Sequence, residues 1–420
     1  MKITLTQFRP NTAEAVWTDC FAQAIAELHK AGGGVLTVPT GEYSTGPIEL
    51  CSNMELHLEP GAVIRFLNDP AAFPLQECQY EGRISHRPKP CLSAFNAENV
   101  ALTGSGVLDG CGAPWWAAPR ARTLANGRPY LLHVENVTHL RVCGGQLRNS
   151  PAWTVHPLNC VDVLIEDVSI CNPYNSPNTD GINPESCRDV RILNCRVDVG
   201  DDCITLKSGT EETPSPVPCE NIVIANCLLV HGHGGIVIGS EMSGGVRNVT
   251  VTNCVFTGTD RGLRVKTRRR RGGCVENLRL SNLVMERVFC PFVFNMYYSC
   301  GTAEKDRWVW EKTPYPVDGG TPAFRNIRIN GVTVVGATAS AGFFYGLAES
   351  PIDGLSLTDC HIEMARGAAP EKPAMMGNLE PMSARGFFLR NAKNVEFHNV
   401  TLKNADGEAY DTDESVDGEF

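Results

Sequence analysis

The chain has 420 residues, of which 42% are hydrophobic, and a formal net charge of −10 at pH 7. The length alone would allow two or three globular domains. The acidic charge disfavours nucleic acid as a partner of the whole surface, and no apolar run is long enough to make a membrane-spanning helix.

The N-terminal residues do not have the pattern of an export signal. Residues 1–10 contain one Lys and one Arg but no apolar core, so we expect no secretory signal and predict a cytoplasmic protein. Residues 15–31 then carry apolar residues spaced as on one face of a helix and end at three glycines, which favour a helix end. These apolar residues are Val16, Cys20, Ala24, Ile25 and Leu28. We predict a helix here, within an N-terminal cap over residues 12–34.

Short strands and long insertions follow. Residues 35–39, 46–50, 54–58 and 62–66 are short apolar segments punctuated by glycine, which predicts strands. Four longer segments interrupt the strand pattern, at residues 68–90, 111–129, 299–322 and 365–385. Long loops inside a compact domain usually carry function, so we expect these insertions to contribute to the functional surface of the molecule.

A repeating unit of about 30 residues organises most of the chain. Each copy has a turn residue followed by Val, Ile or Leu alternating with polar residues, a period of two that is typical of strands. The copies start at Asp162, Asp189, Asn221, Asn248, Asn277, Asn326, Gly354 and Asn394. A leucine-rich-repeat horseshoe would require Leu at fixed offsets, whereas these core positions accept Val, Ile, Leu and Cys. We therefore predict an all-β fold, a parallel β-helix whose coils bury their apolar faces by stacking.

The repeats predict one elongated domain over residues 1–405, with its N-terminal end covered by the helix. Every charged residue in 406–420 is acidic, which predicts a disordered tail. Cysteines recur in one slot of the repeat, as expected for small buried hydrophobes. Examples are Cys195, Cys227, Cys254 and Cys360. No Cys-x-x-Cys pair occurs, so we expect no structural zinc site.

Four polar clusters occur at steps of about one coil. They are Asn178-Thr179-Asp180, Gly200-Asp201-Asp202, Gly232-His233-Gly234 and Arg264-Val265-Lys266. Neighbouring strands of stacked coils lie about 4.8 Å apart, so residues at a similar phase of successive coils share one face. Alone, each cluster would be an ordinary turn or a solvated strand face. Together, in phase with an independent repeat, they predict one groove.

This groove would suit the hydrolysis of a glycosidic bond by inversion. That reaction needs one protonated carboxyl group beside the leaving oxygen and another carboxylate that activates water. Crowding of like charges raises the pKa of one member, which can then act as the acid. Arg264 and Lys266 could hold the carboxylate of an anionic sugar, and His233 could tune the acid or hold a hydroxyl. The reaction requires no cofactor and no metal.

The four clusters, in this order, resemble the pattern of the polygalacturonase family of glycoside hydrolases. The resemblance implies a single-stranded, right-handed parallel β-helix and an anionic galacturonan substrate. It implies Asp201 as general acid, and Asp180 with Asp202 as the groups that activate water. It places five further residues at the catalytic subsite, namely His233, Asn178, Arg264, Lys266 and Tyr298.

This chain departs from the family pattern in two places. Asn183 stands where many members have Asp, which puts a secondary substrate contact there in doubt. Cys203 and Cys219 match a pair that is bridged in secreted fungal members, and without an export signal we expect them to be reduced thiols.

Several functions stay open from the sequence. The first is an exo-acting hydrolase of α-1,4-linked galacturonic acid; a rhamnogalacturonan hydrolase, a calcium-dependent lyase and a carbohydrate-binding β-helix without turnover are the alternatives. The basic run at residues 268–271 suggests nucleic acid or a polyanionic sugar, and its place beside the cation cluster favours the sugar. The loop tryptophans could stack on sugar rings or anchor the loops. The oligomeric state is left open.

Overall fold

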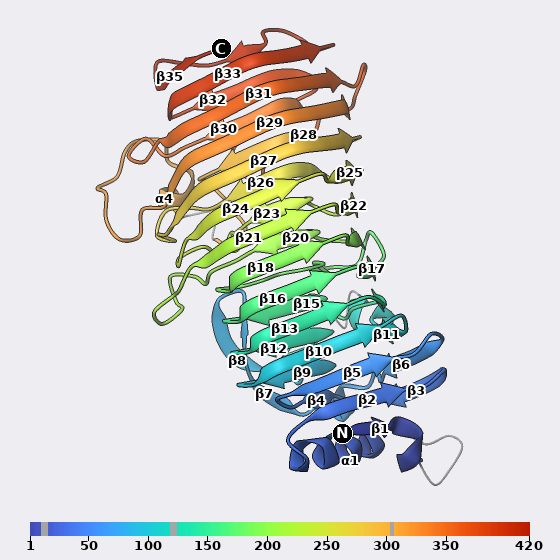
Figure 1. Cartoon of the computed structure of the whole chain (residues 1–420). Coiled ribbons are helices and arrows are strands. Elements are labelled where there is room, and N and C mark those ends of the chain that lie inside the picture. Colours follow the sequence, from blue (N-terminus) through green and yellow to red (C-terminus); the bar gives the residue numbers. More distant parts are fainter. Residues whose placement is uncertain (10–15, 118–123, 303–305) are drawn as a thin grey trace. The chain divides into compact units, whose positions relative to one another are not determined.

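The computed structural model describes residues 1–9, 16–117, 124–302 and 306–420. The chain divides into two compact units, Met1–Asp201 and Asp202–Phe420. The single domain expected over residues 1–405 stays a prediction. Both units have the same internal architecture of stacked parallel coils (Figure 1). In the described residues, no helix has the length and apolar character needed to cross a membrane.

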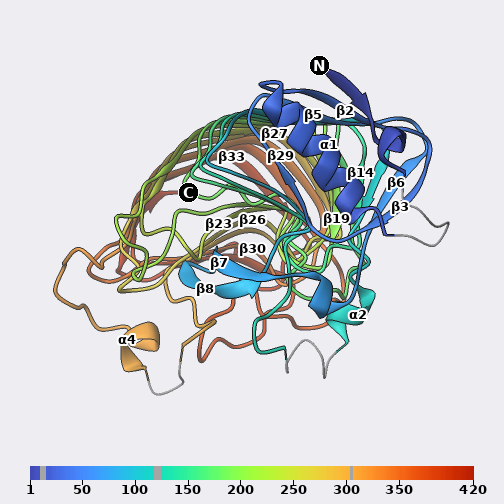
Figure 2. The same ribbon diagram turned by 90° about the horizontal axis from the view of Figure 1, so that it is seen from below.

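Unit 1 begins with the predicted cap. Strand β1 (Lys2–Thr4) pairs with β2 (Gly34–Val38), and between them lie the short helix η1 (Leu5–Phe8) and the helix α1 (Thr18–Lys30). Helix α1 buries one face and packs against β2 and β4, at the first coils (Figure 2). The predicted capping helix is therefore confirmed, with its start at Thr18; residues 12–15 of the predicted cap lie outside the described residues.

Unit 1 contains three parallel sheets, each built from one strand of successive coils. The first is β2, β5 (Met54–Leu58), β10 (Glu98–Gly104), β13 (Thr138–Cys143), β16 (Val161–Glu166) and β18 (Arg188–Leu193). The second is β3 (Gly41–Thr45), β6 (Ala62–Phe66), β11 (Val107–Asp109), β14 (Gln146–Arg148), β17 (Ser169–Cys171) and β19 (Arg196–Val199). The third is β4 (Ile48–Leu50), β9 (Leu92–Phe95), β12 (Leu132–Glu135) and β15 (Val155–Leu158).

Unit 2 continues the same plan. One sheet comprises β21 (Cys219–Ala225), β24 (Val246–Thr252), β27 (Cys274–Glu286), β29 (Ala323–Ala337), β31 (Ile352–Met364), β33 (Ala392–Lys403) and β35 (Val416–Glu419). Strands β22 (Leu228–His231) and β25 (Val255–Thr257) pair in parallel, and β25 joins the second half of β27. The other sheet comprises β20 (Ile204–Leu206), β23 (Ile236–Ile238), β26 (Arg261–Lys266), β28 (Cys290–Asn295), β30 (Ser340–Tyr345), β32 (Arg385–Arg390) and β34 (Tyr410–Asp411).

These sheets confirm the right-handed parallel β-helix that the resemblance implies. The turn residue of the repeat has the expected left-handed geometry: Asn221, Asn248 and Asn277 have φ of 58°, 57° and 57°. Their side-chain amides form a ladder, in which Asn248 donates to Asn221 and Asn277 to Asn248, each at 3.0 Å. Asn fits this position because its short polar side chain tolerates the left-handed region and bonds to the next coil.

The cysteine slot is buried, as predicted. The thiols of Cys227, Cys254 and Cys360 lie in the core, and each donates to the backbone oxygen of the residue two positions earlier, at 3.3–3.4 Å. All eighteen cysteines are thiols, including the pair at Cys203 and Cys219.

The insertions carry small elements of their own. Residues 68–90 contain the short helix η2 (Pro70–Ala72) and an antiparallel hairpin of β7 (Leu75–Tyr80) and β8 (Arg83–Pro88), where the sequence predicts a loop. Helix α2 (Ala113–Trp116) lies in the second insertion and α4 (Arg307–Trp310) in the third. Figure 2 shows the β7–β8 hairpin outside the coils of unit 1.

The C-terminal residues differ from the predicted disordered tail. Strand β34 pairs with β32, and β35 pairs with β33, so residues 410–411 and 416–419 extend the stack. The reason is aromatic packing: the Tyr410 ring stacks on Phe387 at 5.6 Å, and the Phe420 ring contacts Phe397 and Tyr410 at 5.5 and 4.9 Å. A composition argument overlooks these two aromatic residues because the acidic residues outnumber them.

Candidate active site

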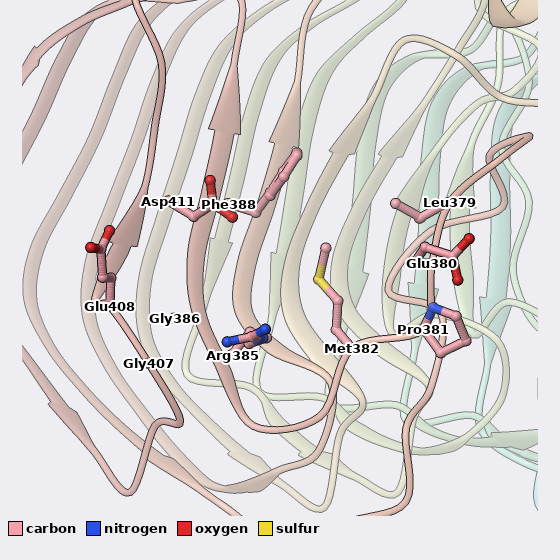
Figure 3. Close-up of a pocket in the computed structure, with 10 residues that line it drawn as sticks. All are labelled: Leu379, Glu380, Pro381, Met382, Arg385, Gly386, Phe388, Gly407, Glu408 and Asp411. Carbon is pink, nitrogen blue, oxygen red and sulfur yellow. The ribbon is translucent and has the colours of Figure 1, made fainter.

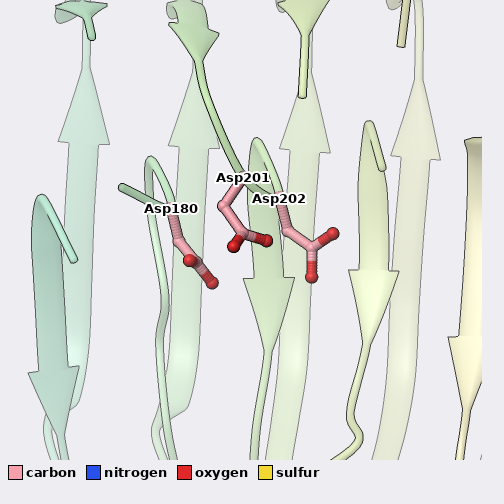
Figure 4. Close-up of side chains that lie close together, drawn as sticks. All are labelled: Asp180, Asp201 and Asp202. Atoms are coloured by element: carbon pink, nitrogen blue, oxygen red, sulfur yellow. The ribbon is translucent and has the colours of Figure 1, made fainter. Parts of the chain in front are cut away.

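Three predicted catalytic carboxylates form one cluster. Oxygens of Asp180, Asp201 and Asp202 lie within 4.8 Å of one another (Figure 4). Asp180 and Asp202 are 4% and 1% exposed, whereas Asp201 is half-buried. The boundary between the units falls at the peptide bond that joins Asp201 to Asp202, so these two side chains are neighbours through the chain itself. The arrangement places one accessible carboxyl group beside two buried ones.

The loop that carries Asp180 in unit 1 is fixed by hydrogen bonds. The backbone oxygen of Asp180 accepts from the amide of Thr154 at 2.8 Å. The hydroxyls of Ser176 and Thr179 are 2.6 Å apart, and Asn172 Nδ2 donates to the backbone oxygen of Thr179 at 3.3 Å. These buried bonds determine where the Asp180 carboxylate points.

Asn178 lies in the same loop of unit 1, with a left-handed φ of 53°. Its Oδ1 accepts a hydrogen bond from the guanidinium of Arg128 at 2.6 Å. Arg128 is the main functional candidate that sequence reasoning missed. It stands alone in an insertion, outside the repeat, so no periodicity connects it with Asn178.

In unit 2, Asp202 is held by two cations. Lys266 Nζ lies 2.7 Å from one carboxylate oxygen, and Arg264 Nη1 lies 3.1 Å from the other. Burial alone would raise the pKa of Asp202, but Lys266 and Arg264 outweigh it and hold that pKa well below its usual value. Asp202 is therefore ionised at neutral pH, which suits the activation of water and not proton donation.

The two cations have a partner that the sequence did not predict. Arg264 and Lys266 are predicted to bind a sugar carboxylate, and the contacts seen here are with Asp202. Both side chains are almost completely buried. Burial, followed by the charge of Arg264, lowers the pKa of Lys266. A contact of either cation with substrate stays a prediction.

Two other predicted residues lie in unit 2 near these groups. The Tyr298 ring centroid is 5.4 Å from Lys266 Nζ, and burial raises the pKa of its hydroxyl. His233 is exposed and lies within electrostatic reach of Asp260. Burial raises the pKa of Asp260, a carboxyl group that sequence reasoning missed because it precedes the Arg-x-Lys strand as an apparent turn residue. Gly234 has no room for a side chain, since a Cβ there would lie 2.5 Å from Val237 Cγ2 and 3.3 Å from Asp202 Oδ1.

Asn183 in unit 1 is completely buried, and neither side-chain atom has a hydrogen-bond partner among the described residues. An unpaired buried amide costs about 1–3 kcal/mol. Asn183, which stands where many family members have Asp, therefore does not reach solvent in this structure, and a substrate contact there stays in doubt.

The basic run in unit 2 has a structural role, which corrects the predicted contact with a polyanion. Arg268 and Arg271 are buried and pair with Glu211, and Arg269 pairs with both oxygens of Glu349. Arg269 also donates to three backbone oxygens of the third insertion. Of this run only Arg270 is exposed, and its guanidinium lies 4.4 Å from the Trp308 ring.

We expect Arg269→Met to lower the free energy of unfolding by about 3–5 kcal/mol, the range for removing one partner of a buried ion pair. Arg270→Met removes the same charge at the exposed neighbour and is the control. Urea unfolding followed by circular dichroism measures both variants. Equal midpoints for the two would contradict the assignment of a structural role to Arg269.

One cavity in unit 2 is unrelated to the predicted site. It has a volume of about 670 Å³ and includes none of the predicted catalytic residues (Figure 3). Glu380, Glu408 and Asp411 outnumber Arg385 among its charged side chains. Excess negative charge disfavours an anionic sugar here.

The three aspartates could in principle also hold a cation through one oxygen each. Oxygen ligands of this kind suit Ca²⁺ or Mg²⁺. Lys266 and Arg264 already neutralise Asp202, however, so the donor set fits a bound metal poorly. A metal-free reaction stays our prediction.

Comparison with known proteins supports the family resemblance. The family profile described as glycosyl hydrolases family 28 matches residues 36–367. A probable polygalacturonase of Vitis vinifera is 30% identical and covers 84% of this chain and 72% of its own length. An endo-polygalacturonase of Pectobacterium carotovorum is also 30% identical, over 61% of this chain and 65% of its own length. The crystal structure of a hyperthermoactive exopolygalacturonase from Thermotoga maritima is similar, with 29% identity, a TM-score of 0.77, and coverage of 96% of this chain and 92% of that one.

The β-helical coils and the aspartate cluster define a glycoside hydrolase. The sequence match extends from the early coils, through the four polar clusters, to the last insertion. The chain belongs to family 28 of the glycosyl hydrolases, the polygalacturonase family.

Proposed function

We propose that this enzyme removes galacturonic acid from the ends of α-1,4-linked galacturonides by single displacement with inversion. Asp201 gives its proton to the glycosidic oxygen as the bond to C1 breaks. Asp180 and Asp202 accept a proton from a water molecule, whose oxygen forms the new bond to C1. The proposal is carried by the different environments of two aspartates in the cluster. Asp202 is kept ionised by two cations, while Asp201 is accessible.

The stereochemistry is the sharpest test of this mechanism. Carboxyl groups of inverting glycosidases are commonly about 6.5–9.5 Å apart, and those of retaining enzymes about 5–5.5 Å. The oxygens here lie within 4.8 Å of one another, so a retaining reaction is the second candidate. We expect the first product to be the β-anomer, because water attacks opposite the α-linked leaving group. Proton NMR during the first minutes of hydrolysis measures the anomer, and an initial α-anomer would replace inversion by retention.

Two observations support exo action. The similar structure from Thermotoga maritima is named an exopolygalacturonase, and the β7–β8 hairpin is bonded to the coils of unit 1 through Gln79. The Pectobacterium relative, in contrast, is named an endo-polygalacturonase. Digestion of hexagalacturonate decides between the modes: exo action gives the monomer and pentamer first, whereas a dimer, trimer and tetramer mixture from the start would show internal cleavage.

The same digest tests the other classes. A lyase would give an unsaturated product that absorbs in the ultraviolet, and a binding protein without turnover would release no reducing ends. A rhamnogalacturonan hydrolase would act on that polymer in preference to galacturonan. We also propose a cytoplasmic location, in which the enzyme acts on short imported oligosaccharides; recovery of the native protein only from the external medium would contradict it.

A further inference from the structure

Two arginines of unit 1 lie beside the catalytic loop, and neither has a carboxylate as a hydrogen-bond partner in the part of the chain that the structure describes. Arg128 is 8% exposed, and its guanidinium donates to the backbone oxygens of Pro151 and Pro177 at 2.9 and 2.7 Å and to Asn178 Oδ1 at 2.6 Å. Among the described residues, every hydrogen-bond acceptor found for Arg128 is a neutral oxygen. A buried guanidinium remains protonated in proteins. Within the described ranges, the hydrogen bonds of Arg128 therefore leave its charge without a bonded carboxylate.

Arg87, on strand β8, brings a second cation to the same place. Its Nη2 donates to the backbone oxygen of Arg128 at 3.0 Å, and its guanidinium carbon lies 3.8 Å from the Tyr80 ring. Its Nε is buried and has no hydrogen-bond partner among the described residues. Tyr80 in turn stacks on the Trp153 ring at 4.9 Å. Arg87 therefore rests on an aromatic wall, and Arg128 lies beside it.

The hairpin that carries this wall is fixed to the coils of unit 1. Gln79 Nε2 donates to Glu185 at 2.7 Å, and the Tyr130 hydroxyl donates to the backbone oxygen of Gln79 at 2.7 Å. Glu185 is completely buried and also contacts His156 Nε2 at 3.0 Å. The position of the hairpin is thus set by buried polar bonds, which makes its side chains suitable for specific binding.

The wall lies close to the catalytic aspartates of unit 1. Thr154, which follows Trp153, donates its amide to the backbone oxygen of Asp180 at 2.8 Å, and Arg128 donates to Asn178, two residues before Asp180, at 2.6 Å. The sugar that is cut at its C1 must contact both the proton donor and the group that activates water. A sugar in that position would bring its C6 carboxylate towards the two arginines.

We propose that Arg87 and Arg128 form a specificity site for the carboxylate of the sugar whose C1 is attacked, and that Tyr80, supported from behind by the buried Trp153, forms its aromatic wall. This inference rests on the proposed hydrolysis of galacturonides. It differs from the sequence prediction, which gives carboxylate binding to Arg264 and Lys266, because those cations hold Asp202.

The test compares two substrates: trigalacturonate, and the same trimer with a methyl ester on its non-reducing sugar only. Wild type should hydrolyse the terminal bond of the free acid with a kcat/KM about 10- to 100-fold higher than that of the ester, since a hydrogen-bonded charge is lost. Arg87→Gln should remove most of this preference, mainly through KM on the free acid. Arg83→Gln, an exposed change on the same strand, is the matched control and should keep the wild-type preference.

Arg128→Lys keeps a charge but loses the planar fork, and should also weaken the preference. If Arg128→Lys fails to fold, the Arg87 variant and the ester comparison in wild type still decide the matter. A wild type that cuts acid and ester equally well, or an Arg87→Gln enzyme with an intact preference, overturns the specificity site and leaves the hydrolase standing. If the wild-type enzyme cuts neither trimer and also fails to cut longer galacturonides, both the specificity site and the proposed hydrolase function are overturned.

Discussion

Asp201→Asn should reduce kcat on oligogalacturonides by about 10²–10⁴-fold, the range contributed by general acid–base catalysis. The amide is nearly the same size as the carboxyl group but cannot give a proton to the leaving oxygen. KM should change little, because the substitution removes an interaction that stabilises only the transition state and leaves the groups that bind the sugar in place. Initial rates on trigalacturonate over a range of concentrations give both constants.

A substrate that needs no acid separates this role from a general loss of structure. Nitrophenolate leaves without protonation, so Asp201→Asn should hydrolyse a nitrophenyl galacturonide at nearly the wild-type rate. Asp202→Asn is the matched control: it makes the same chemical change at the adjacent residue and should stay slow on both substrates, because water activation is still required. Equal losses on the nitrophenyl substrate for both variants would refute Asp201 as the acid.

Lys266→Met should destabilise the protein by about 3–5 kcal/mol at neutral pH, the range for removing one partner of a buried ion pair. The substitution leaves the buried Asp202 carboxylate with Arg264 alone. Arg325→Met breaks the exposed pair with Glu276, whose nitrogen and oxygen are 2.7 Å apart, and should cost about 1 kcal/mol or less. Denaturant midpoints measure both, and similar losses would contradict a special role for the buried pair.

The pH dependence follows from the same contact. The pKa of Asp202 in the folded state lies below its unfolded value of about 3.9, so the ionised carboxylate adds stability above that pH. The contribution is lost as pH falls through the folded-state pKa. Without Lys266 the folded-state pKa rises, so the acidic loss of kcat/KM should begin at a higher pH in Lys266→Met than in wild type. The double variant Asp202→Asn/Lys266→Met should recover part of the stability.

The fold could be predicted because its pattern is periodic. A turn residue such as Asn248 recurs in each copy, and the alternation of apolar residues fixes which side chains enter the core. The same regularity predicted the cluster of Asp180, Asp201 and Asp202, because residues at one phase of successive coils must lie on one face. In this fold, the strand register therefore places residues that are one coil apart in the sequence next to each other in space.

The parts that sequence reasoning missed lie outside the repeat. Arg128 and the β7–β8 hairpin belong to insertions, where no period relates a residue to the coil it contacts. The prediction for the basic run was wrong for a similar reason. Charge composition indicates solvent exposure, but Arg269 is buried and pairs with Glu349, which lies in a loop far away in the sequence. Tyr410 and Phe420 likewise order a segment whose composition is that of a disordered chain.

The last coil also bears on how copies of the protein behave toward one another. The strands of an open stack offer unpaired backbone groups at their ends, and these can recruit a strand from another molecule. Strand β35 and the turn before it carry Asp413, Glu414, Asp417 and Glu419, all of one sign. Asp413 pairs with Arg390, whereas a strand of another copy that approached β35 would meet the like charges of Asp417 and Glu419, which disfavour edge-to-edge pairing there.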